Sequence, residues 1–345
     1  MNGLPRIGFL GMGWIGRSRM EAVARSGAAR VAAIVDADPS RAREAAALCP
    51  GATCGPETAL LLEGDLDGVV IATPSALHAE QCHTFLGRGI AVFCQKPLGR
   101  TAKETASIVA EARRRDRLLA TDFCYRRVAG MDGVRDLALS GALGRVVLVD
   151  AVFHNAYGPD KPWFRDPALS GGGCLMDLGI HLLDLAAWIL DFPTAVRVTS
   201  RLHARGERLR GRRDHVEDQA LVEIDLASGA VIRLACSWNL PAGRDAVISL
   251  SVYGTEGGAA LRNREGSFYD LVVERYRGTS REPLATPCTD WQDRAIVDWV
   301  LQLGRSSGFD PEAERLTTVA ELLDLAYEAD GIDGGIELRA AGSRT

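Results

Sequence analysis

The chain has 345 residues, of which 47% are hydrophobic and 25% charged, and its formal net charge at pH 7 is −5. This length favours two domains over one, and the composition is typical of a globular protein. A slightly acidic chain offers no electrostatic footprint for nucleic acid or for an anionic membrane surface. We also expect no membrane-spanning helix, because we find no apolar run of about 18 residues.

The cysteines and the first residues of the chain indicate in which cellular compartment the protein works. The eight cysteines are scattered singly among apolar residues and form no Cys-x-x-Cys motif. We therefore expect buried thiols rather than disulfides, and no metal site. The first predicted strand begins by about residue 5, which leaves no room for a signal peptide. Together these features predict a cytoplasmic protein.

The first third of the chain alternates short apolar runs with helix-like stretches. Asp38-Pro39 and Thr101 are typical starts of helices. This alternation predicts an α/β domain with a doubly wound parallel sheet. The expected strands are residues 6–10, 30–35, 68–72, 90–94 and 118–121, and the expected helices are residues 15–25, 39–48, 76–87 and 101–115.

A glycine motif connects the first strand to the first helix. Gly11, Gly13 and Gly16 have the spacing Gly-x-Gly-x-x-Gly, and Asp36 ends the second strand 20 positions after Gly16. Gly11 would permit the tight turn, Gly13 would let the backbone approach a pyrophosphate, and Gly16 would let the helix pack close to the strand. The alternative is a glycine-rich turn in an ordinary β-α-β unit. Strand, spacing and acid together favour dinucleotide binding.

Asp36 also predicts which dinucleotide binds. Trp14 and Ile15 begin the helix whose free N–H groups would hold the phosphates. Asp36 would accept hydrogen bonds from the adenosine ribose hydroxyls and repel a 2′-phosphate, which favours NAD over NADP. Arg41 lies five positions later and could approach a 2′-phosphate. NADP therefore stays the less favoured alternative.

The pattern changes after about residue 125. Apolar and polar residues then alternate in runs joined by short turns, which predicts an antiparallel sheet. We expect an α+β domain with an open, mainly antiparallel sheet over residues 123–345, following a dinucleotide-binding domain over residues 1–122. The C-terminal helix could pack back on the first domain. The expected strands are residues 146–154, 195–203, 219–225, 230–238, 246–253 and 268–276, with helices at 174–190 and 311–329.

Two further strand ends of the first domain carry polar residues. Thr73-Pro74 follows one strand and Gln95-Lys96-Pro97 follows the next. Ligands of open α/β sheets bind beyond the carboxyl ends of the strands. Lys96 could therefore bind the nicotinamide ribose or a substrate oxygen, or polarise a carbonyl. The alternative is a solvated surface lysine, which is the usual state of this residue type.

Three glycines open the long apolar helix of the second domain. Residues 171–173 are glycines, which we expect to allow close approach of a ligand, and Asp177 and His181 follow four residues apart. This spacing places both side chains on one helix face. A histidine can take a proton from a hydroxyl as hydride leaves the carbon, and Asp177 could orient it. The alternatives are a structural pair or two metal ligands, and no third ligand is evident.

Weaker candidates surround these segments. Arg126 follows Tyr125 just after the first domain and could reach the crevice. His154 and Trp163 precede the glycine-led helix and could line a polar pocket for a substrate.

Taken together, these segments resemble the Gfo/Idh/MocA oxidoreductases, which include glucose–fructose oxidoreductase and inositol 2-dehydrogenase. The resemblance covers essentially the whole chain. The family pattern matches the glycine motif, Thr73-Pro74 with His78, the Lys96-Pro97 dipeptide, Tyr125-Arg126, and Asp177 with His181. One position departs from it, because Gln95 stands where the family has a glutamate. A neutral amide stabilises the neighbouring lysine cation less than a carboxylate would.

The resemblance implies an activity. It predicts an NAD-dependent oxidoreductase that moves a hydride to or from a sugar, sugar derivative or cyclitol. Lys96, Asp177 and His181 would be its catalytic set, with His181 as the acid/base, and His78 would belong to the cofactor site. Dimers or tetramers packed through the open face of the second sheet are implied as well. Two alternatives are an NAD-dependent glycosidase that uses transient internal redox and a non-enzymatic NAD-sensing regulator.

Overall fold

The computed structural model describes residues 3–338, and the chain divides into two compact units. The first comprises Met1–Cys124 with Asp293–Thr317, and the second Tyr125–Gln292 with Thr318–Thr345.

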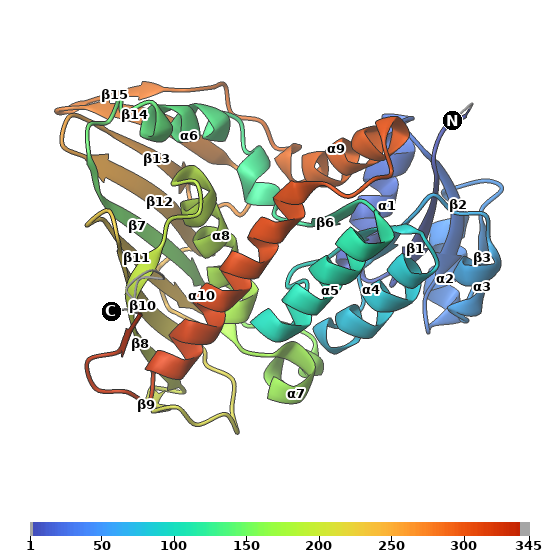
Figure 1. Ribbon diagram of the computed structural model, residues 1–345, viewed down its shortest axis with the longest axis horizontal. Helices are drawn as coiled ribbons and strands as arrows, with labels where there is room; N and C mark the ends of the chain where they lie inside the picture. The colour runs from blue at the N-terminus through green and yellow to red at the C-terminus, as the bar shows by residue number, and fades with distance from the viewer. Residues whose placement is uncertain (1–2, 339–345) are drawn as a thin grey trace. The chain divides into compact units, whose positions relative to one another are not determined.

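The first unit is built on a parallel sheet of six strands (Figure 1). The strand order β3-β2-β1-β4-β5-β6 is that of a doubly wound dinucleotide-binding fold, so the predicted fold class is confirmed. The strands are β1 (Arg6–Leu10), β2 (Arg30–Val35), β3 (Thr53–Gly55), β4 (Gly68–Ile71), β5 (Ala91–Cys94) and β6 (Leu119–Thr121). The helices between them are α1 (Trp14–Ser26), α2 (Pro39–Ala46), α3 (Ala59–Glu63), α4 (His78–Gly87) and α5 (Ala102–Arg115).

A late segment completes the core of this unit. Most of helix α9 (Trp291–Arg305) belongs to it, although almost 170 residues of the second unit precede that helix. Trp299 is 2% exposed, and its ring centroid lies 5.6 Å from that of Phe93 on β5. A Cβ atom on Gly68 would come within 2.6 Å of the Trp299 ring, so glycine at the start of β4 makes room for the indole. The sequence did not predict α9.

The second unit contains a ten-stranded sheet. Every strand pair in it is antiparallel except β7 with β11, which confirms the predicted open, mainly antiparallel sheet. The order is β15-β14-β13-β12-β7-β11-β10-β8-β16, with β9 paired to β8. The strands are β7 (Val146–Asn155), β8 (Ala195–Ala204), β9 (Glu207–Arg208), β10 (Gln219–Leu226), β11 (Val231–Ser237), β12 (Ala246–Gly254), β13 (Gly258–Asn263), β14 (Leu271–Arg277), β15 (Ser280–Pro283) and β16 (Ile336–Glu337).

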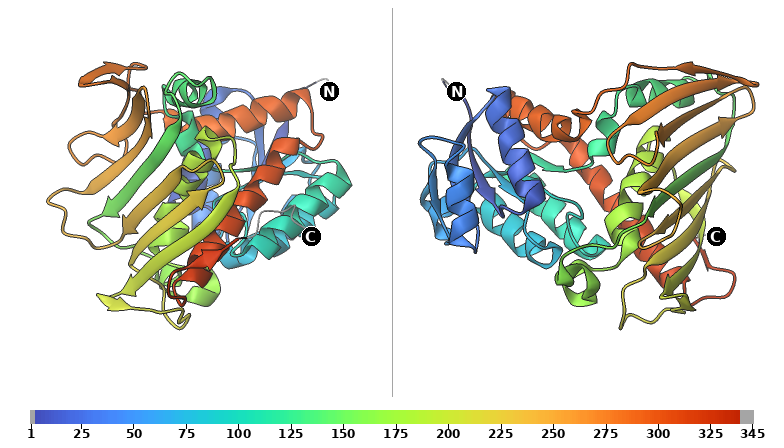
Figure 2. Two further views of the ribbon diagram at one scale, coloured as in Figure 1. Left: turned by 60° about the vertical axis from the view of Figure 1, so that its left-hand side comes forward. Right: turned by 180° about the vertical axis from the view of Figure 1, so that it is seen from behind.

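Helices α6 (Met131–Leu139), α8 (Ile180–Ile189) and α10 (Arg315–Ala329) lie on one face of this sheet (Figure 2). Alternate residues of the strands are accordingly buried, such as Val149, Ala151 and Phe153 on β7. The residues between them face the other side, where Leu221 and Tyr253 are exposed.

The expectation of no apolar run long enough to span a membrane was wrong in one place. The helical segment Pro167–Ile189 passes that test by length and composition, with a mean hydropathy of 1.3. However, 89% of its apolar window is buried inside the protein. The segment is the core helix of the second unit, and its apolar character follows from that packing.

Candidate active site

The glycine loop has the geometry that a dinucleotide requires. Gly11 has φ +92°, and a Cβ atom there would lie 2.7 Å from the backbone of Ala72. A Cβ atom on Gly16 would lie 1.9 Å from the carbonyl oxygen of Gly11. Gly13 precedes helix α1, whose N-terminus has no side-chain cap. The first-turn N–H groups therefore have no side-chain cap, and their binding of a pyrophosphate stays a prediction.

Asp36 is fixed by the same loop. It lies directly after β2 and is 8% exposed. One carboxylate oxygen accepts the Met12 N–H at 2.5 Å, and the other accepts the Asp38 N–H at 2.8 Å. A carboxylate has about four acceptor positions, so Asp36 keeps capacity for ribose hydroxyls. Arg41 is exposed and lies 3.4 Å from the carboxylate of Asp38.

His78 ties two strand ends together. Its Nδ1 lies 2.7 Å from the carbonyl oxygen of Pro97, and its Nε2 lies 2.8 Å from that of Thr73. The peptide bond between Lys96 and Pro97 is cis. The ring is 1% exposed, and burial lowers its pKa below the usual value. His78 thus acts as a strut between the segments that follow β4 and β5, and both of its ring nitrogens are already occupied.

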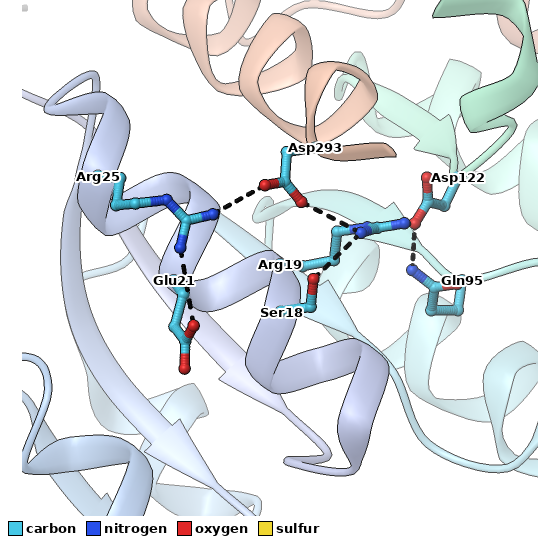
Figure 3. A network of polar contacts seen from close by, with 7 residues as sticks. All are labelled: Ser18, Arg19, Glu21, Arg25, Gln95, Asp122 and Asp293. Atoms are coloured by element: carbon cyan, nitrogen blue, oxygen red, sulfur yellow. Dashed lines mark hydrogen bonds and ion pairs between the residues drawn. The ribbon is translucent and has the colours of Figure 1, made fainter. Parts of the chain in front are cut away.

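Gln95 belongs to a buried polar network (Figure 3). Its side-chain amide donates to the carboxylate of Asp122 at 2.5 Å, and Arg19 Nε donates to the same oxygen at 2.6 Å. The guanidinium of Arg19 also reaches Asp293 at 3.4 Å. Asp122 and Arg19 are 1% and 2% exposed. A carboxylate is therefore present beside position 95, but it comes from the end of β6, which sequence reasoning missed.

Asp177 lies in an irregular turn of the buried helix of the second unit. Residues Leu175–Gly179 form a π-helical turn directly before α8, and such turns are frequent at functional sites. The indole Nε1 of Trp238 donates to the Asp177 carboxylate at 3.1 Å. Trp238 follows β11, so that strand helps to orient the acid. No pattern in the sequence predicts this contact.

His181 lies four residues after Asp177, in the first turn of α8. Among residues 172–189, Asp177 and His181 are the two that are not buried. They therefore share the one face of this helix that reaches the surface of the core. The His181 ring centroid lies 5.1 Å from that of Tyr125, which in turn lies 4.8 Å from that of Trp291. Aromatic packing thus holds the imidazole.

The weaker candidates take other positions. Arg126 forms a bidentate ion pair with Asp184, at 2.8 and 2.6 Å, so its guanidinium is committed inside the second unit. His154 lies 2.8 Å from the hydroxyl of Ser237, and burial lowers its pKa. By alternation it projects from the sheet face opposite Phe153, which places it away from the face that packs on α8. Trp163 stacks on Phe164 with ring centroids 3.9 Å apart.

Comparisons with known proteins agree with this geometry. Residues 5–123 match the model of the oxidoreductase family with an NAD-binding Rossmann fold, and residues 131–260 match that of the GFO/IDH/MocA C-terminal domain. The rhizopine catabolism protein MocA of Rhizobium meliloti is 30% identical over 74% of this chain and 78% of its own length. Inositol 2-dehydrogenase of Acidothermus cellulolyticus is 29% identical over 91% of both chains.

Solved structures show the same fold. GenD2 from gentamicin A biosynthesis, solved with NAD, is 28% identical and superposes with a TM-score of 0.80 over 99% of this chain and 98% of its own. Levoglucosan dehydrogenase, solved with NADH, is 20% identical and has a TM-score of 0.81 over 95% of this chain and 97% of its own. Residues 5–123, with their parallel sheet, are thus an NAD-binding Rossmann domain.

Proposed function

The chain belongs to the Gfo/Idh/MocA oxidoreductase family, and from this premise we propose that it is an NAD-dependent dehydrogenase of sugars or cyclitols. Its substrate would be a secondary alcohol or lactol of a sugar, sugar derivative or cyclitol. The relatives named for such substrates, inositol 2-dehydrogenase and levoglucosan dehydrogenase, support this class. The observation that carries the proposal is the Asp177–His181 pair, held at the open face of an otherwise buried helix.

Each residue has a chemical role in this proposal. Bound NAD⁺ supplies the acceptor for the hydride. His181 takes the proton of the reacting hydroxyl through an imidazole nitrogen, because a histidine side chain can take up and release protons near neutral pH. Asp177 stabilises the imidazolium that forms and can accept a hydrogen bond from a substrate hydroxyl. Lys96 binds a substrate oxygen or the nicotinamide ribose.

Asp36 supports NAD as the preferred dinucleotide. Its carboxylate is nearly buried and held at the end of β2 by the glycine loop itself, so a 2′-phosphate would meet a fixed negative charge. The exposed Arg41 lies beside Asp38 instead.

The test is absorbance at 340 nm with purified protein, NAD⁺ or NADP⁺, and a panel of sugars, amino sugars, uronic acids and inositols. We expect NADH to form with NAD⁺ and one class of polyol. His181→Ala should lower turnover by about 100-fold or more while the Kd for NAD stays within about threefold. His203→Ala, on β8 of the same unit, is the matched control. Tightly retained NAD⁺ without net NADH would instead favour the glycosidase, and silence without retained NAD would count against both.

A further inference from the structure

The space beside the glycines before Asp177 is filled by other residues of the protein. A Cβ atom on Gly172 would lie 1.9 Å from the hydroxyl of Tyr327, and one on Gly173 would lie 1.9 Å from the carbonyl oxygen of Glu217. The sequence predicts that these glycines admit a ligand. In the structure their absent side chains make room for Glu217 and Tyr327, so these two residues are the reason for the glycines at positions 172 and 173.

Glu217 binds three successive backbone amides at the start of the helical segment. Its carboxylate accepts the N–H of Gly173 at 3.0 Å and that of Leu175 at 2.9 Å. Its carbonyl oxygen accepts the N–H of Cys174 at 2.9 Å. Helix starts leave such N–H groups without intrahelical partners, and here one residue satisfies all three.

Tyr327, on α10, completes this arrangement. Its hydroxyl donates to the Glu217 carboxylate at 2.9 Å. Glu217 is 2% exposed and Tyr327 is 4% exposed. Burial raises the pKa of both groups, and for Tyr327 the neighbouring carboxylate raises it further. A buried carboxylate is costly unless it is hydrogen-bonded, and here the Tyr327 hydroxyl and the backbone amides supply those hydrogen bonds.

Asp218, the residue after Glu217, is also linked to Asp177, through Trp238. The carbonyl oxygen of Asp218 accepts the backbone N–H of Trp238 at 2.8 Å. The indole of Trp238 then donates to the Asp177 carboxylate at 3.1 Å. Residues 217 and 218 therefore fix both the start of the helix that carries Asp177 and the indole that orients its carboxylate.

We propose that Glu217 and Tyr327 are positioning residues for the reaction, a clamp that sets where Asp177 and His181 lie. The inference rests on the proposed function for its catalytic readout. Neither residue touches substrate in this account. They act through the three amides and through Trp238. A displacement of about 1 Å at a reacting group can cost on the order of 100-fold in rate, so a loosened clamp should appear in turnover.

The test uses the full chain with Glu217→Gln and Tyr327→Phe. Asp330→Asn is the matched control, because Asp330 is 3% exposed in the same unit and accepts the N–H groups of Leu202 at 2.7 Å and Gly211 at 2.8 Å. We expect Glu217→Gln to lower kcat by about tenfold or more, and Tyr327→Phe by less, with KM and the Kd for NAD little changed. Asp330→Asn should lower the Tm but leave kcat unchanged.

A second readout does not depend on turnover. The indole N–H resonance of Trp238, assigned with Trp238→Phe, reports its hydrogen bond to Asp177. We expect Glu217→Gln and Tyr327→Phe to shift or broaden it, and Asp330→Asn to leave it in place. If the resonance and kcat are unchanged in both clamp variants, the proposal is overturned. If the wild type turns over no polyol but the resonance shifts as expected, the proposed function fails and the clamp stands.

Discussion

At the residue scale, the structure shows the partners of several side chains whose roles the sequence could only suggest. The glycine motif and Asp36 were predictable because their spacing encodes a backbone geometry. The partners of Gln95, Arg126 and His154 were not, because each depends on a residue at least 27 positions away, such as Asp122 for Gln95. Pairing across such distances follows from tertiary packing, which no local pattern records.

Asp36 gives a prediction about the cofactor. Asp36→Ala removes the carboxylate that we propose as the ribose acceptor, and it also leaves the Met12 N–H without its partner at 2.5 Å. We expect the Kd for NAD to rise by about 10- to 100-fold and the preference against NADP to relax. Titration of the apo protein with both dinucleotides measures this. An unchanged ratio of the two Kd values would remove Asp36 from the specificity site.

Gln95 gives a second prediction. The Asp122 oxygen that accepts its amide is shared with Arg19, so Gln95→Glu would place two carboxylates in contact inside the protein. We expect the free energy of unfolding to fall by about 1–3 kcal/mol, and more at high pH, where both groups must ionise. Thermal melts between pH 5 and pH 9 measure the effect. Adding Asp122→Asn should restore stability, whereas additive losses in the double variant would contradict this account.

At the element scale, helices and strands with a clear period were predictable, and their irregular parts were not. The parallel strands other than β3, and the helix at residues 174–190, were expected near their observed places. The π-helical turn at Leu175–Gly179 was not expected, because it lies where Glu217 and Trp238, which are distant in the sequence, hydrogen-bond to the segment. Strand β13 and helix α9 were also missed. The short run Gly258–Asn263 is hard to assign by periodicity alone.

The His78 strut gives a prediction about pH. Burial lowers the pKa of His78 in the folded protein below its ordinary value of 6.5. The unfolded chain therefore binds a proton more readily, and His78 stabilises the fold above about pH 6.5 but loses this contribution as the pH falls. His78→Gln should lower the Tm at pH 8 and flatten the decline of Tm between pH 7 and pH 5.

The control for that prediction lies on the same helix. His83 is bonded to Ser107 at an exposed position of α4. His83→Gln should leave both the Tm at pH 8 and its slope with pH near those of the wild type. Equal slopes in the wild type and His78→Gln would show that the strut does not titrate.

At the scale of the whole molecule, chain order and spatial order differ. The segment Asp293–Thr317 returns to the first unit, while the residues from Thr318 onward belong to the second. Length predicted two domains, and the change of residue pattern after about residue 125 predicted a boundary near residue 122. They could not predict that a helix from the last fifth of the chain fills the core of the first domain, because that requires knowing which apolar faces remain uncovered.

This arrangement makes the dinucleotide-binding unit depend on α9. Trp299 is 2% exposed and packs on Phe93 and Gly68. Trp299→Ala should lower the free energy of unfolding by about 3–5 kcal/mol and weaken NAD binding at raised temperature. Leu301→Ala, on the same helix but 44% exposed, is the control and should cost less than about 1 kcal/mol. Denaturant titration measures the free energy of unfolding of both variants, and equal losses in the two would contradict this prediction.

We propose that this protein passes a hydride from a polyol carbon to NAD⁺. The most direct measurement is mass spectrometry of the nicotinamide after incubation of the protein and NAD⁺ with polyols deuterated at their ring carbons. The account predicts one deuterium in each NADH formed, in proportion to the oxidised polyol, and almost none with His181→Ala. Reduced cofactor without deuterium, or deuterium that remains in the carbohydrate while NAD⁺ is unchanged, would contradict it.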